Sequence, residues 1–128
     1  MVVIDTHVLL QDALEPARLS TRAQRALEGS DGSLAASDIS LWEIAMLIAK
    51  GRLRPGADAA EFIEKLLEAR AISVLPITPR IAVLSQSDEF RHRDPADRII
   101  AATAIVHGAR LVTADARLRR VKALRVIW

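Results

Sequence analysis

The sequence predicts an α/β fold: a three-layer α/β/α sandwich with a mostly parallel sheet of four to five strands. Three observations support this prediction. Short apolar runs alternate with helical segments from end to end. Hydrophobic residues are 51% of the chain but aromatic residues only 3%, so Ala, Val, Leu and Ile must build the core. The length of 128 residues suits a single domain over residues 1–128.

The first half of the chain is expected to hold two strands and four helices. Residues 2–5 form a short β-branched run that ends in an acid, as in a buried strand. Ser20 is a preferred N-cap residue, and Gly29 and Gly51 suit helix ends. These signals predict strands over 2–5 and 34–36 and helices over 6–14, 20–27, 38–50 and 59–70.

The helix predicted over 38–50 is the most apolar of this half. The spacing of its apolar residues is helical, at Ile39, Trp42, Ala45, Met46 and Ala49. We interpret the stripe formed by Leu41, Trp42 and Met46 as core or as a dimer surface.

The second half is expected to repeat the alternation. Pro79 and Pro95 suit helix starts, and Gly108 suits the end of a helix whose last residue is His107. A cation at a helix C-terminus is favourable, so we interpret His107 as structural. The pattern predicts helices over 80–90, 95–107 and 116–120 and strands over 72–75, 111–113 and 125–127.

Acidic residues recur where ligands bind in such sheets, outside the carboxyl ends of the strands. Asp5 ends the first predicted strand, and Asp115 follows the fourth. Glu43 lies one turn into the helix after the second strand, and Asp94 and Asp97 open the helix over 95–107. We therefore expect four or five carboxylates to converge on one edge of the sheet.

Each acid also has a structural alternative. Asp94 followed by Pro95 is a preferred helix start, and Asp97 is favoured by the helix dipole in the first turn. Glu43 could form a capping box with Ser40. Asp5 could cap the helix that begins at Thr6, and Asp115 could cap the helix that begins at Ala116.

A cluster of carboxylates needs a compensating positive charge, because like charges raise one another's pKa. Oxygen ligands without any cysteine favour Mg²⁺ or Mn²⁺ over zinc. Such an ion suits phosphodiester hydrolysis, with nearby arginines holding the backbone. Six basic residues and one acid lie between Arg110 and Arg125, which fits either a phosphate partner or a solvated face.

The chain resembles the PIN domain, in particular the VapC-type toxin ribonucleases of VapBC toxin–antitoxin pairs. The matching stretches are VVIDTHVLL, SDISLWEIAMLIAKGRL, HRDPADRIIAATAIVHGARLVTAD and RLRRVKALRVIW. The resemblance implies a metal-dependent endoribonuclease that acts on RNA, often forms a homodimer and is silenced by a cognate antitoxin.

The resemblance also implies roles for individual residues. The acidic quartet that binds Mg²⁺ or Mn²⁺ would be Asp5, Glu43, Asp97 and Asp115. Thr6, Asp94 and Thr113 would support it. Arg93, Arg98, Arg117 and Arg119 are our candidates for contacts to RNA, and His92 is interpreted as a loop residue rather than a general base.

Two other functions are alternatives to this one. A catalytically silent PIN-fold module would bind RNA or a partner without turnover. A phosphatase-like enzyme with Asp5 as nucleophile would want a second acid two residues later, where His7 stands. The N-terminus has no basic region before its apolar run and no apolar stretch approaches the ~18 residues of a membrane span, so we expect a cytoplasmic protein without a membrane segment.

Overall fold

The computed structural model describes residues 1–29, 33–90 and 94–128. Its five strands form one sheet in which every neighbouring pair is parallel. The strands are β1 (Val2–Ile4), β2 (Leu34–Ser37), β3 (Ser73–Leu75), β4 (Arg110–Val112) and β5 (Arg125–Ile127). The predicted α/β class and parallel sheet are therefore confirmed.

The strand order is β3-β2-β1-β4-β5, so the chain builds outward from β1 in both directions. Val3 of β1 pairs with Ala35 of β2 on one side and with Leu111 of β4 on the other. The direction of winding changes between β1 and β4, which makes this the topological switch point of the sheet. Ligands of parallel α/β sheets bind at that point, outside the carboxyl ends of the strands.

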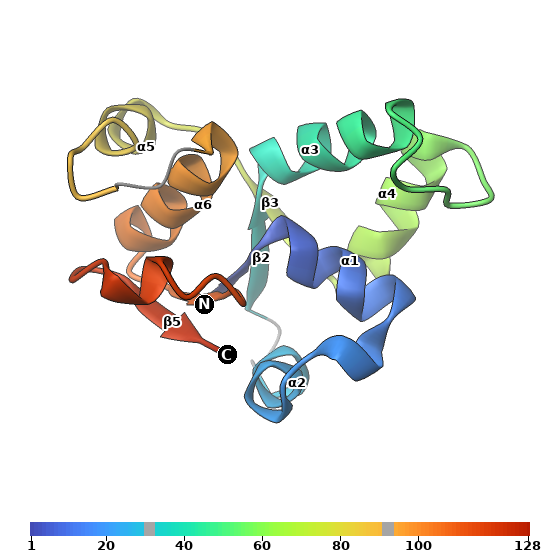
Figure 1. The fold of residues 1–128 in the computed structure, drawn as a ribbon, viewed down its shortest axis with the longest axis horizontal. Helices are drawn as coiled ribbons and strands as arrows, with labels where there is room; N and C mark the ends of the chain where they lie inside the picture. The colour runs from blue at the N-terminus through green and yellow to red at the C-terminus, as the bar shows by residue number, and fades with distance from the viewer. Residues whose placement is uncertain (30–32, 91–93) are drawn as a thin grey trace.

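Helices cover both faces of the sheet. They are α1 (Thr6–Leu14), α2 (Thr21–Glu28), α3 (Asp38–Ala49), α4 (Ala59–Ala69), α5 (Pro79–Leu84) and α6 (Pro95–Val106), with short 3₁₀ turns at η1 (Pro16–Arg18) and η2 (Leu118–Arg120). Figure 1 shows α5 and α6 on one side of β2 and β3 and α1, α3 and α4 on the other. None of the helices described is long and apolar enough to cross a membrane.

The alternation of side chains along β1 divides the core in two. Val2 and Ile4 belong to a cluster with residues of α1, α2 and α3, whereas Val3 belongs to a cluster with residues of α5 and α6. All three residues are at most 1% exposed, which explains why this strand reads as a continuous apolar run.

Two helix starts show how capping sets the boundaries. The Asp94 carboxylate accepts the Ala96 N–H at 2.9 Å with Pro95 in the first turn, so the predicted cap of α6 is confirmed. The alternative of a capping box formed by Ser40 and Glu43 is excluded, because α3 begins earlier, with Ser37 as its N-cap.

The predicted apolar stripe of α3 does not coincide with its buried face. Trp42 is 61% exposed, and Ala45 and Ala49 are also exposed. The fully buried positions are Ser40, Glu43 and Ile44. Two of these three are polar, so apolar spacing alone pointed toward a different face of the helix.

Other boundaries also differ from the prediction, most of them by one residue. The helix expected over 80–90 ends at Leu84, because the Ser85 hydroxyl donates to the Ala82 carbonyl and polar turns follow. The segment 116–120 is only the 3₁₀ turn η2, and η1 was not predicted. β4 begins one residue earlier than expected, at Arg110.

We expect Ile100→Ala to destabilise the fold by about 2–5 kcal/mol, because it removes a side chain that is 1% exposed in the core of α6. Val83→Ala is the control, since Val83 is 76% exposed and should change stability by less than ~0.5 kcal/mol. Urea unfolding followed by circular dichroism measures both. Equal effects of the two substitutions would contradict the assignment of the core.

Candidate active site

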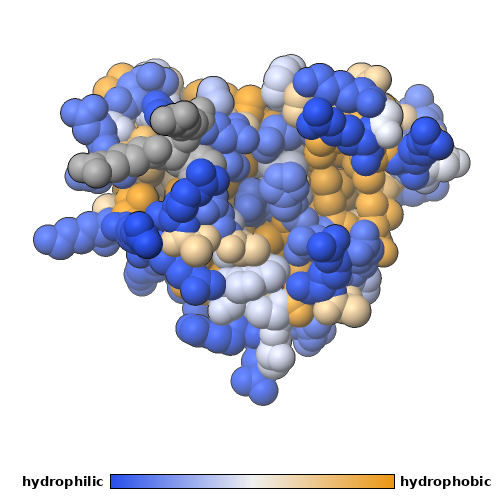
Figure 2. All heavy atoms as spheres, viewed as in Figure 1, coloured by the Kyte–Doolittle hydropathy of each residue, from blue (hydrophilic) through white to orange (hydrophobic). Residues whose placement is uncertain are grey.

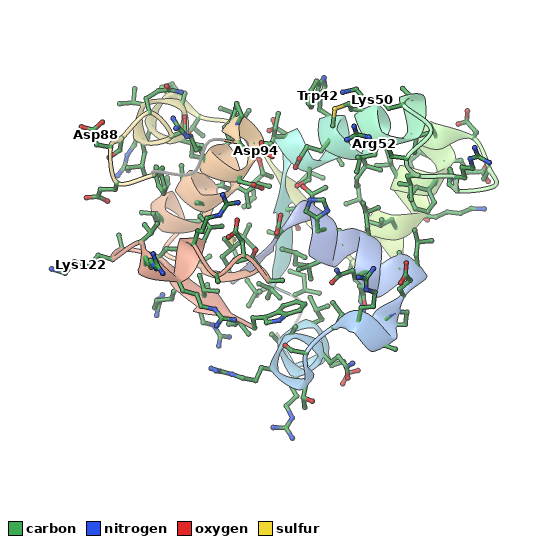
Figure 3. The ribbon with its side chains drawn as sticks, viewed as in Figure 1. Trp42, Lys50, Arg52, Asp88, Asp94 and Lys122 are labelled. Atoms are coloured by element: carbon green, nitrogen blue, oxygen red, sulfur yellow. The ribbon has the colours of Figure 1, made fainter. Side chains whose placement is uncertain are left out.

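A cleft of about 630 Å³ opens beside the carboxyl ends of β1 and β4, at the switch point of the sheet. Four carboxylates line it together with other side chains: Asp5, Asp94, Asp97 and Asp115, with His7, Gln11, Ala114 and Arg117. Asp94 stands at the end of α6 nearest α3 (Figure 3). The cleft therefore joins acids that the chain carries more than a hundred residues apart.

Asp5 is the buried acid of the cleft, only 7% exposed. It occupies the N-cap position of α1, but its side chain makes no capping hydrogen bond, so the structural alternative of a cap does not account for this carboxylate. Its Oδ2 accepts the Thr113 hydroxyl at 2.8 Å, whereas its buried Oδ1 has no hydrogen-bond partner among the described residues. Burial raises the pKa of Asp5, and the hydrogen bond from Thr113 opposes that rise.

Glu43 is also buried, at 8% exposed, but it is not among the residues that line the cleft. The Thr6 hydroxyl donates to its Oε1 at 2.5 Å, and the Ser40 hydroxyl lies 2.8 Å from that of Thr6. Burial raises the pKa of Glu43, and the negative charges of Asp94 and Asp5 raise it further. Two acids of the cleft therefore act electrostatically on Glu43, although Glu43 does not line it.

Thr113 connects the acids of the two central strands. Its hydroxyl donates to Asp5 and accepts the backbone N–H of Asp115 at 3.1 Å. The Asp115 carboxylate accepts the backbone N–H of Arg117 at 3.0 Å and its Nε–H at 3.3 Å. Asp115 thus stabilises the turn before η2, rather than capping a helix at Ala116 as predicted.

The start of α6 brings two further acids to the cleft. Asp94 caps the helix, and Asp97 follows in its first turn, where the helix dipole favours a negative charge. Asp97 is half-buried and lines the cleft. The helix start therefore both orders the chain and directs a carboxylate into the site.

The predicted RNA contacts are spread unevenly. Arg117 lines the cleft, Arg98 is half-buried on α6, and Arg119 is exposed on η2. Arg93 and His92 lie outside the described residues.

Gln11 is a cleft residue that the sequence did not predict, although it stands one helical turn after His7 on α1. Its buried Oε1 has no hydrogen-bond partner among the described residues.

The donor set fits a hard divalent cation. It consists of carboxylate oxygens, and the buried Oδ1 of Asp5 provides an acceptor whose hydrogen-bonding capacity is unused. In the described part of the chain, however, no three His, Cys, Asp or Glu side chains stand close enough to hold one ion. The hydrogen bonds of Glu43 to Thr6 and of Asp115 to Arg117 direct those carboxylates to other partners.

Comparison with known proteins places this arrangement in a family. Ribonuclease VapC22 of Mycobacterium tuberculosis is 40% identical over 119 residues, covering 92% of this chain and 89% of its own. VapBC2 from Rickettsia felis, solved with a promoter DNA fragment, has a similar fold, with a TM-score of 0.74, 17% identity and coverage of 98% of this chain and 97% of that chain. A toxin–antitoxin complex from Klebsiella pneumoniae gives a TM-score of 0.66 at 23% identity, covering 97% and 95%. The PIN domain family matches residues 2–124, and this chain belongs to it.

Proposed function

We propose that the chain is a divalent-metal-dependent endoribonuclease and the toxin of a toxin–antitoxin pair. The observation that carries the proposal is the buried, unpartnered Oδ1 of Asp5 at the edge of a cleft with three further carboxylates. Such an arrangement is costly unless a cation binds there. The 40% identical relative, named a ribonuclease, supports RNA as the substrate.

The residues that would hold Mg²⁺ or Mn²⁺ are Asp5, Glu43, Asp97 and Asp115, with Asp5 as the anchor. When bound, the ion supplies an activated water, orientation of the scissile phosphate and stabilisation of the leaving oxygen. Carboxylates buried near one another, as Asp5 and Glu43 are, would gain most from its charge.

The other residues would prepare those carboxylates. Thr113 holds one oxygen of Asp5, and Thr6 holds one oxygen of Glu43. Asp94 orders the helix start that carries Asp97. Arg117, whose side chain is 69% exposed, is placed to exchange Asp115 for an RNA phosphate.

A protein partner is the second part of the proposal. The structural neighbour from Klebsiella pneumoniae was solved as a toxin–antitoxin complex, which supports a cognate antitoxin. Figure 2 shows apolar surface between α1, α3 and α4, with hydrophilic side chains around it, and such a patch is typical of a partner-binding surface. We retain a homodimer in the cytoplasm as an expectation from the family resemblance.

One observation favours a second candidate, the silent PIN-fold module. The described residues hold no ready three-ligand cluster, and Asp115 is paired with Arg117. Such a module would bind RNA without cutting it, so turnover separates the two candidates.

Cleavage of RNA in the presence of Mg²⁺ or Mn²⁺ tests the proposed activity. We expect Asp5→Asn and Asp97→Asn each to lower the cleavage rate by more than ~100-fold, since loss of a ligand should exceed the effect of removing its supporting partner. Asp88→Asn is the matched control, because Asp88 is an exposed acid away from the cleft (Figure 3). Absence of cleavage by the wild type, or wild-type rates in the two cleft variants, would refute the proposal.

The raised pKa of Asp5 predicts how stability depends on pH without metal. Its ordinary value is 3.8, and burial raises the folded value above it. Between the two values the folded state binds more protons, so stability falls as pH rises through that window. Asp5→Asn should therefore raise the melting temperature of the metal-free protein at neutral pH.

Calorimetry across pH, with and without Mg²⁺, measures this effect. The gain from Asp5→Asn should vanish below the ordinary pKa, and Mg²⁺ should stabilise the wild type more than the variant. Asp88→Asn should follow the wild type. If Asp5→Asn were less stable than the wild type at neutral pH, the charged carboxylate would stabilise the metal-free fold, which would contradict this prediction.

Two substitutions at Asp94 separate its cap from its charge. Asp94→Ala should cost about 1 kcal/mol, whereas Asp94→Asn should preserve stability because asparagine caps equally well. Urea unfolding and RNA cleavage are measured on both variants. If Asp94 only supports the site, Asp94→Asn also keeps the cleavage rate; a strong loss of activity with unchanged stability would place its charge in the metal site.

A further inference from the structure

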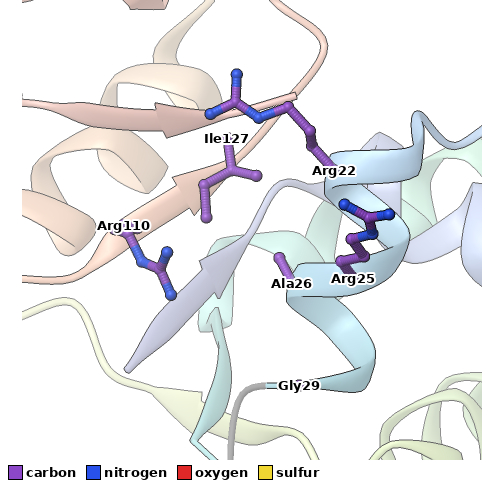
Figure 4. Close-up of a pocket in the computed structure, with 6 residues that line it drawn as sticks. All are labelled: Arg22, Arg25, Ala26, Gly29, Arg110 and Ile127. Carbon is purple, nitrogen blue, oxygen red and sulfur yellow. The ribbon is translucent and has the colours of Figure 1, made fainter.

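A second groove, of about 330 Å³, lies between α2 and the strands β4 and β5. Figure 4 shows its lining: Arg22, Arg25, Ala26 and Gly29 from α2 and its end, Arg110 from β4, and Ile127 from β5. The guanidinium groups of Arg22 and Arg110 stand on either side of Ile127 (Figure 4). No carboxylate is among these lining residues.

The three arginines of the groove differ from the arginines that form ion pairs elsewhere in the described residues. Arg18, Arg70 and Arg117 each pair with a carboxylate within 4.0 Å, whereas in the described residues no ion pair involves Arg22, Arg25 or Arg110. Three positive charges around one hollow repel each other, and an anion in the hollow would relieve that repulsion.

The sequence of α2 concentrates its positive charge on the groove. Arg22, Arg25, Ala26 and Gly29 follow one another at helical spacing and share one side of the helix. Glu28, the single acid of α2, is not part of the lining. The hydrogen bond from Arg70 to Asp12 contributes most to the raised pKa of Arg70, and the negative charge of Glu28 adds to it.

One backbone hydrogen bond links a residue of the groove to the acidic cleft. Its Ile127 carbonyl accepts the backbone N–H of Thr113 at 3.2 Å, and Thr113 in turn donates to Asp5. Arg110 begins β4, three residues before Thr113, so about 10 Å of strand separates the two positions at ~3.3 Å per residue. A polyanion that extends a few units beyond the cleft would reach the arginines.

We propose that this arginine groove binds the phosphate backbone of RNA at a distance from the scissile bond. Arginine presents several N–H donors that match phosphate oxygens, and Ala26 and Ile127 add an apolar contact surface. The groove would therefore favour long RNA over short oligonucleotides. This inference rests on the proposed function, because it assigns a second contact to the same substrate.

The test compares wild type with the triple variant R22A/R25A/R110A. Binding of a long single-stranded RNA is measured without metal, so that no RNA is cut, over a range of salt concentrations. We expect at least a 10-fold weaker affinity and a log–log salt slope that is shallower by about 2, since each lost phosphate contact contributes ~0.7 on single strands. Cleavage of a short oligonucleotide that fills only the cleft should be unchanged.

Two further variants make the result specific. R22K/R25K/R110K keeps the charges and should recover most of the salt slope. Arg80→Ala is the matched control, since Arg80 is an exposed arginine on α5, across the sheet from α2, and it should bind RNA as the wild type does.

Several outcomes would overturn the groove as an RNA site. Unchanged affinity and slope in the triple variant would do so, and so would an equal loss of affinity for duplex DNA of the same length, which would assign the groove to nucleic acid in general. The proposed function fails separately: a wild type that binds RNA through the arginines but never cuts it would refute only the nuclease.

Discussion

The hydrogen bond from the Thr113 hydroxyl to Asp5 joins the two strands between which the winding of the sheet changes direction. It holds one oxygen of a buried carboxylate at 2.8 Å and leaves the other oxygen without a partner. The same hydroxyl accepts the N–H of Asp115, and the backbone of Thr113 is held in turn by β5. The positions of Asp5 and Asp115 therefore both depend on one threonine, which the parallel pairing of β1 with β4 brings to the site.

Two ion pairs of this protein have opposite consequences. Arg70 makes two hydrogen bonds to Asp12, at 2.8 and 2.9 Å, which join α4 to α1 in a well-defined geometry. The pair of Arg117 with Asp115 is longer and more exposed, at 3.3 Å, so it contributes little stability. The first pair supports the frame that carries the cleft, whereas the second can exchange partners at low cost within it.

Local features of the sequence were sufficient for much of the fold. The buried strand just before Asp5 and the Asp94–Pro95 helix start follow from short-range rules of burial and capping, and both are present in the structure. The orientation of α3 could not be predicted from apolar spacing, because its buried face carries Ser40 and Glu43. Both side chains contact the hydroxyl of Thr6, which lies 37 residues before Glu43 in the chain. No rule of sequence spacing reveals such a distant partner.

The candidate site was predictable as a set of residues but not as a set of contacts. Asp5, Asp97 and Asp115 could be selected because each stands beside a strand or helix end at the expected edge of the sheet. The bond of Thr113 to Asp5 and the diversion of Asp115 to Arg117 depend on side-chain geometry, which the pattern does not contain. Gln11 was missed because an amide on a helix carries no distinctive signal.

The separation of Asp5 and Thr113 by 108 residues also determines when the site can exist. During synthesis β4 and the threonine that follows it emerge only after Asp5 and helices α1 to α6 have been made. Long-range parallel pairing is slow to form because loop closure precedes any favourable contact. A nascent chain, or one cut by a protease before β4, therefore carries Asp5 and Glu43 without the strand that orders them, and its cleft is not assembled.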